Sequence, residues 1–332
     1  MVKREDIEEI VSDVINDFYG INTKCSIIKS SPYYAQALEM SEKYGLKLSK
    51  CTKTQLRFKD EGHVNPQNNR ITSTELRFDD MLMNKHIDFT NENEDIEEGV
   101  YSIDTILGYY DNMPSNLKNY VGLMDFVDTN DPNHSTVYDP NLRRENVVYI
   151  TNDAYIGKTY YNTDTHNLER IMAHEMGHCM DYGQLNSEDK SFIKKVYEGD
   201  ESIMNQESLD WFKSVVLPKT HVHSGNGGFS EAVHHDAEDK GVDVVDVIPS
   251  TYAKMYYYDN EGDVNELGEH FAETVSMVSF RDKVDKGNAR ITTGSPILAS
   301  LGIGDELDYD KYMGDIGSMR SVGYVEGLLF ND

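Results

Sequence analysis

The sequence predicts an α+β fold in which short strands precede two helices that carry the chemically distinctive residues. Residues 121–127 and 146–150 have the apolar, β-branched composition of strands. Between Leu168 and Tyr182, apolar residues recur at three- and four-residue steps, which is the spacing of one helix face. A second helical run of the same kind has its apolar stripe at Leu267, Phe271, Thr274 and Val278. The segment from 109 to 285 is therefore expected to be an α+β domain.

The N-terminal part of the chain is predicted to be an α/β extension of this domain. Residues 4–19 and 34–44 have the periodicity of amphipathic helices, and residues 26–28 that of a short strand. The acidic stretch 91–98 suits a loop at a boundary. The expected division is an N-terminal domain of unknown role over 1–108, a domain over 109–285 with a long insertion at 184–249, and a short C-terminal extension over 286–332.

The helix over 168–182 contains two histidines four residues apart, His174 and His178, with Glu175 beside the first. Residues four apart project from the same face of a helix about one turn apart, so both rings can bind one Zn²⁺. Glu175 can then take a proton from a zinc-bound water without occupying a coordination position. The pattern HExxH therefore predicts a zinc hydrolase site, with one zinc ion per chain.

A catalytic zinc normally takes three protein ligands and leaves a fourth position for water. A metzincin would place Gly and His three and six residues after His178, but Asp181 and Gln184 stand there, which excludes that class. The alternative source of the third ligand is a glutamate on a later helix, which Asn265 can cap. Glu269 and Glu273, four apart, share one face of that helix, and Glu266 is a further alternative.

Three segments of the chain share a pattern with one family of zinc peptidases. They are HEMGHCMDY at 174–182, PSTYA at 249–253 and EHFAE at 269–273. Together they resemble the anthrax lethal-factor-type peptidases, which are gluzincins and include phage-encoded relatives. The resemblance covers the two helices, the tyrosine segment and, loosely, the preceding strands, roughly half of the chain. It implies a zincin fold and peptide-bond hydrolysis.

Position by position, the resemblance implies that His174, His178 and Glu269 are the zinc ligands and that Glu175 is the general base. Tyr252 would be the hydroxyl that stabilises the developing oxyanion. Three consecutive tyrosines between it and Glu269 are alternatives for that role, namely Tyr256, Tyr257 and Tyr258. Glu273 would contact a ligand without binding the metal itself. Asp181 would have an orienting or structural role. The connection between the two helices is longer than the family pattern.

That connection, the insertion at 184–249, holds His221 and His223 just before the glycine-rich residues 225–228. An HxH pair can bind a second metal ion, but we expect a solvated loop with scattered histidines. Whether the insertion is a lid over the active site is left open.

The net charge and the apolar runs of the chain indicate which partners it can bind. The formal net charge is −28, which repels phosphate backbones and anionic lipids, so neither nucleic acid nor a membrane is expected as a partner. A protein or peptide substrate is expected instead. The start of the chain lacks the apolar core of a signal peptide, no apolar run reaches the length of a membrane span, and the three cysteines form no CxxC pair. We therefore expect a cytoplasmic or virion-associated protein.

The expected function is that of a zinc-dependent endopeptidase. One alternative is a non-catalytic structural or virion-associated protein that retains the zincin fold as a scaffold. Another is a protease of narrow specificity, acting either as a toxin in a recipient cell or on an intracellular regulator.

Overall fold

The computed structural model describes most of the helices and strands of the chain. The described residues are 27–65, 70–79, 102–126, 137–139, 147–150, 167–183, 205–225, 227–248, 267–279 and 318–331, with single positions between 188 and 195 and between 253 and 257.

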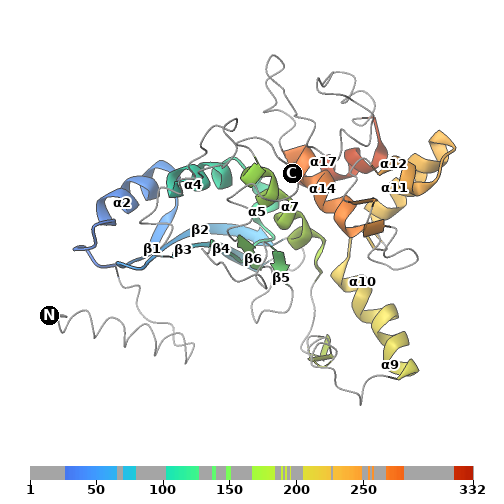
Figure 1. Ribbon diagram of the computed structural model, residues 1–332, viewed down its shortest axis with the longest axis horizontal. Helices are drawn as coiled ribbons and strands as arrows, with labels where there is room; N and C mark the ends of the chain where they lie inside the picture. The colour runs from blue at the N-terminus through green and yellow to red at the C-terminus, as the bar shows by residue number, and fades with distance from the viewer. Residues whose placement is uncertain are drawn as a thin grey trace, which may run out of the picture.

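A six-stranded mixed sheet lies in the N-terminal half of the described chain (Figure 1). Its strand order is β1-β2-β3-β4-β6-β5. The strands are β1 (Lys47–Cys51), β2 (Gln55–Asn65), β3 (Arg70–Asp79), β4 (Leu123–Phe126), β5 (Val137–Asp139) and β6 (Val147–Ile150). Strands β1 to β3 are antiparallel, β3, β4 and β6 are parallel neighbours, and β5 returns antiparallel to β6.

Alternation along the strands gives the sheet one apolar and one charged face. Phe78 and Phe126 are cross-strand partners on the apolar face, and their rings stack with centroids 4.8 Å apart. The adjacent pair, Arg77 and Asp125, lies on the opposite face and forms an ion pair of 3.2 Å. Since successive side chains of a strand point to opposite faces, the apolar residues must be covered on one side only.

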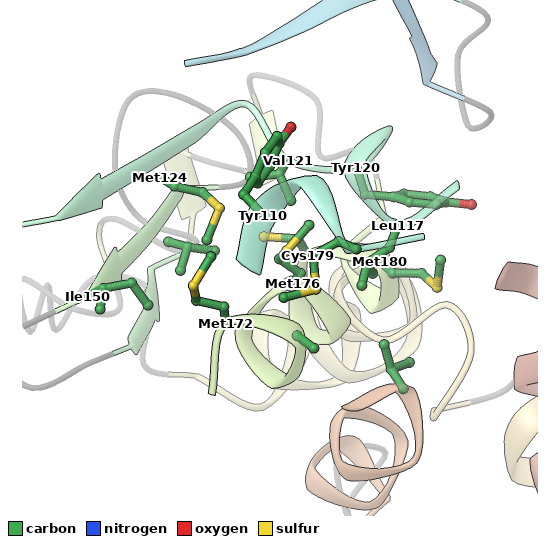
Figure 2. Close-up of a cluster of buried hydrophobic side chains, with 14 of the residues drawn as sticks. Tyr110, Leu117, Tyr120, Val121, Met124, Ile150, Met172, Met176, Cys179 and Met180 are labelled. Carbon is green, nitrogen blue, oxygen red and sulfur yellow. The ribbon is translucent and has the colours of Figure 1, made fainter. Parts of the chain in front are cut away.

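Four helices cover the apolar face of the sheet (Figure 1). They are α2 (Tyr34–Lys43), α4 (Ile103–Asp111), α5 (Ser115–Lys118) and α7 (Asn167–Asp181). Figure 2 shows Met172 of α7 and Met124 of β4 pointing toward each other in this layer, and both side chains are fully buried. Helix α7 is thus fixed on the sheet by an apolar face rich in methionine.

The remaining helices lie beyond α7, away from the sheet (Figure 1). Helix α14 (Gly268–Ser279) packs against α7, and α17 (Arg320–Phe330) packs against both α14 and α11 (Gly228–Lys240). The short α12 (Val244–Val247) follows α11. A protruding arm consists of α9 (Gln206–Trp211), a π-helical turn (Phe212–Val216) and α10 (Leu217–Thr220).

The α+β class is confirmed, and the strands predicted at 121–127 and 146–150 are β4 and β6. The helix predicted at 34–44 is α2, whereas the helix predicted at 4–19 lies outside the described residues. Strands β3 and β4, on either side of residue 108, pair in one sheet. The three-part division of the chain stays a prediction. Within the described residues, no helix has the length and apolar character needed to cross a membrane.

Candidate metal centre

Helix α7 presents two chemically different faces. Its buried apolar residues, among them Met172, Met176 and Cys179, recur at helical spacing and face the sheet layer (Figure 2). His174 and His178 lie on the other side and face α14. The apolar face therefore fixes the rotation of the helix about its axis, and this rotation decides where the two imidazoles point.

Helix α14 carries Glu269 in its first turn and packs across α7. The apolar stripe predicted for this helix is fully buried and consists of Leu267, Phe271, Thr274 and Val278. The helices approach closely where Gly177 meets Ala272. The glycine inside the HExxH pattern thus has a packing role, because it lets the third ligand approach the first two.

Three ligand atoms converge between the two helices. The Nε2 atoms of His174 and His178 are 3.2 Å apart. Glu269 Oε2 lies 3.1 Å from Nε2 of His174 and 3.5 Å from Nε2 of His178. A tetrahedral zinc with bonds of about 2.0–2.1 Å has ligand atoms about 3.3–3.4 Å apart. The three separations match the edges of such a tetrahedron, so these residues fit a single metal ion.

The hydrogen bonding of Glu269 supports the same fit. Its Oε2 is buried and has no hydrogen-bond partner among the described residues. A buried carboxylate oxygen without a partner costs free energy unless a cation satisfies it. On the far side of the ring, Nδ1 of His174 lies 3.5 Å from Oε1 of Glu273. Ligand histidines usually have such a partner on the other ring nitrogen, and it fixes the orientation of the imidazole.

The charges of the cluster are strongly coupled. Burial lowers the pKa of His174, but the adjacent carboxylate of Glu269 and its charge raise it more, with smaller contributions from Glu273 and Glu175, and the net pKa is about 9. The pKa of His178 is also raised, since the charge of Glu269 outweighs the effect of burial. Burial raises the pKa of Glu269, but the two histidines outweigh it and hold that pKa well below its usual range. The site therefore stabilises positive charge beside Glu269.

Glu175, the predicted general base, is buried beside the ligand group. It follows His174 directly on α7, is 9% exposed, and its charge contributes to the raised pKa of both histidines. It is not among the atoms of the convergent ligand group in the described chain. Its carboxylate is thus near the ligands without being one of them.

At the C-terminal end of α7, Asp181 holds the segment that follows α10. Its Oδ1 accepts hydrogen bonds from the backbone N–H groups of His223 (2.7 Å) and Ser224 (2.9 Å). Its Oδ2 accepts from the Ser224 hydroxyl and lies 3.1 Å from Nδ1 of His221. Burial raises the pKa of Asp181, but its bond and charge interaction with His221 lower it more, so the net pKa lies below its usual value.

The HxH pair of the insertion does not form a second metal site. His221 faces Asp181, whereas the ring of His223 stacks on Phe271 and places Nδ1 2.8 Å from the hydroxyl of Tyr324. The two rings therefore have different partners. In the described part of the chain, the group of His174, His178 and Glu269 is the one cluster able to hold a metal.

Several predicted site residues lie outside the described residues, namely Tyr252, Tyr258 and Glu266. Tyr256 is described and is 40% exposed, and Tyr257 packs partly against the core. The assignment of the oxyanion-stabilising hydroxyl stays a prediction. The contacts of Asp181 with the 221–224 segment were missed from the sequence, because they join residues about forty positions apart that share no local pattern.

Comparison with known protein families, with curated proteins and with solved structures finds no match to this chain. The function must therefore be inferred from the geometry of the two helices. An HExxH helix and a glutamate on a later helix form a group that could hold a metal ion. The arrangement resembles the metal site of a zincin.

Proposed function

We propose that this protein is a zinc-dependent endopeptidase that acts in the manner of the lethal-factor-type gluzincins. The observation that carries the proposal is the convergence of the two Nε2 atoms and Glu269 Oε2 at the edge lengths of a zinc tetrahedron. A zinc ion held there would supply an activated water at neutral pH and polarise the carbonyl of a scissile peptide bond.

The residues around the ligands have separable roles in this proposal. Glu175 takes the proton of the attacking water and returns it to the leaving amine, a contribution of typically about 10²–10⁴-fold. Glu273 orients the ring of His174 through Nδ1. Tyr252 is proposed to donate its hydroxyl hydrogen to the oxyanion of the tetrahedral intermediate. The expected substrate is a protein or an extended peptide.

The first test is the metal content of the purified full chain and of its Glu269→Ala variant, measured by elemental analysis. We expect about one zinc per chain in the wild-type protein and much less in the variant, because a site with two neutral ligands holds zinc weakly. Absence of zinc after zinc-replete purification would contradict the proposal and favour a scaffold role for the fold.

The second test separates metal binding from catalysis. Glu175→Gln should retain zinc but lose cleavage of a peptide library that the wild-type protein cleaves, by about 10²-fold or more. Glu231→Gln, in the first turn of α11, is the control and should change neither property. Cleavage by Glu175→Gln within a few-fold of wild type would remove Glu175 from the mechanism.

A further inference from the structure

A histidine and an aspartate form a pair beside the candidate metal centre, and the proposed chemistry does not use them. We propose that His221, held by Asp181, is a substrate-binding residue whose Nε2 forms a hydrogen bond with the backbone of a peptide bound at the metal. The inference rests on the proposed function and extends it from the ligands to the binding of the substrate chain.

Asp181 lies on the same face of α7 as the two histidine ligands. It follows His178 by three residues and His174 by seven, and residues at these spacings lie one above the other on a helix. The carboxylate is 1% exposed, and its Oδ1 accepts two backbone N–H bonds from the segment after α10. Asp181 is therefore a rigid acceptor one turn beyond the ligands.

The hydrogen bond to Asp181 fixes the orientation of His221. A carboxylate can only accept, so Nδ1 of His221, 3.1 Å from Oδ2, carries a proton. In the neutral ring Nε2 is then an acceptor, on the side of the ring away from Asp181. Within the described chain, Nε2 makes no hydrogen bond. It is also not a buried atom, and the side chain is 23% exposed. Nε2 is therefore available to a ligand.

Both ligand-bearing helices flank this imidazole. Toward α14, the ring packs on Gly268, where its Cε1 and Nδ1 lie 3.5 Å from the position of a Cβ on that residue. Gly268 directly precedes the ligand Glu269. Toward α7, the neighbouring N–H of Val222 donates to the carbonyl of Asp181 at 2.9 Å. An extended peptide placed at the metal and reaching one or two residues along these helices meets Nε2 of His221, and its N–H groups are the matching donors.

The ring is not needed to hold its own segment in place. Without the imidazole, Asp181 keeps the two backbone bonds at Oδ1 and the bond from the Ser224 hydroxyl at Oδ2. His221→Ala is therefore expected to fold with its metal centre intact. A fastening role for the ring would instead appear as a loss of stability or of zinc, which is how the two roles are distinguished.

The test compares two zinc-binding probes on the zinc-loaded full chain by calorimetry. Acetohydroxamate reaches only the metal, whereas N-acetyl-Ala-Ala-hydroxamate adds a peptide backbone. His221→Ala should bind acetohydroxamate as the wild type does, but bind the peptide probe about tenfold more weakly, the loss expected for one hydrogen bond. His221→Gln should recover part of that loss. His234→Ala, an exposed histidine of α11, is the control and should bind both probes normally.

Three results would overturn the inference. Unchanged affinity of His221→Ala for the peptide probe would remove the contact with substrate. Equal weakening of both probes, or loss of stability or of zinc, would show that the ring fastens the structure around the metal centre rather than binding substrate. Failure of the wild-type, zinc-loaded protein to bind either probe would contradict the proposed function and this inference with it, whereas the first two results leave the proposed function standing.

Discussion

Gly177 lies directly against the backbone of Ala272. A Cβ added to Gly177 would stand 3.0 Å from Cα of Ala272 and 3.1 Å from Cβ of Val275. These contacts are shorter than ordinary van der Waals separations, and one of them is to backbone, which cannot rotate away. The spacing between α7 and α14, and with it the distance from Glu269 to the two histidines, thus depends on the absence of a side chain at position 177.

Replacing Gly177 by alanine should push the two helices apart. Alanine gains up to about 1 kcal/mol in helix propensity, but overpacking of a core costs about 1–3 kcal/mol, so we expect a net loss of stability. Zinc affinity should fall as well, because Glu269 moves away from His174 and His178. Urea unfolding and competition for zinc with a chelator measure the two effects.

Gly323 in α17 provides the matched control. Nothing lies within 4 Å of a Cβ added there, so Gly323→Ala should leave zinc affinity unchanged and raise stability by up to about 1 kcal/mol. If Gly177→Ala behaved like Gly323→Ala, the close approach at the helix crossing would not control the metal centre.

The sequence predicted the ligand cluster because its signals are local. The four-residue spacing of His174 and His178 alone predicts that they share one face of a helix. Burial of the stripe from Leu267 to Val278 fixes the rotation of the later helix, and Glu269 then faces the two histidines. Strands β2 and β3 were not predicted. They do carry short alternations, such as Leu56-Arg57-Phe58, but the strands are long and charged, and pairing with each other and with β4 decides their structure.

Contacts that join distant parts of the chain were beyond local patterns. The HxH pair of His221 and His223 suggested metal binding as one alternative, yet the fold gives one ring to Asp181 and the other to Tyr324. Whether a histidine is a ligand, an anchor or a core residue depends on which side chains the tertiary structure brings to its ring nitrogens.

Glu269 and Glu273 should differ in their effect on zinc binding. Glu269→Gln removes the anionic ligand, and zinc should be lost at concentrations that saturate the wild type. Glu273→Gln weakens the support of Nδ1 of His174, for which about a 10–100-fold loss of affinity is expected. Chelator competition gives both affinities, with Glu231→Gln of α11 as the control. If Glu273→Gln were the more damaging change, the ligand would be Glu273.

His223 should make the protein less stable as the pH falls below neutrality. Burial lowers its pKa in the folded state, partly offset by the charge of Asp181, whereas an unfolded histidine titrates near about 6.5. The contribution is fully present above that value and is lost as the pH falls toward the folded pKa, because the unfolded chain takes up the proton first.

The corresponding experiment compares wild type with His223→Phe, which retains an aromatic ring against Phe271. The free energy of unfolding of the zinc-loaded proteins, measured by urea between about pH 8 and 5.5, should fall more steeply for wild type. Loss of the hydrogen bond to Tyr324 adds an offset that does not change with pH. His234→Ala should keep the wild-type slope, and equal slopes for wild type and His223→Phe would refute the prediction.

The stability of the C-terminal helix α17 should depend far more on Asp236 than on Asp239. Both residues are on α11, and both contact the first turn of α17. Asp236 is 4% exposed and accepts from the backbone N–H of Arg320 (2.7 Å) and Ser321 (3.0 Å) and from the Ser321 hydroxyl (2.7 Å). These N–H groups have no partner within their own helix, so Asp236→Ala leaves the buried donors of Ser321 and the part-buried N–H of Arg320 unsatisfied, at a cost of about 2–3 kcal/mol.

Asp239 instead pairs with the side chain of Arg320 at 2.7 Å, where both side chains are more than half exposed. Such exposed pairs contribute about 0–1 kcal/mol, so Asp239→Ala should be nearly neutral in urea unfolding. Because α17 also holds Tyr324 against His223, proteolytic release of the C-terminal segment should accelerate in Asp236→Ala and not in Asp239→Ala. Equal protection of α17 in the two variants would show that packing against α14, rather than this carboxylate, holds the helix in place.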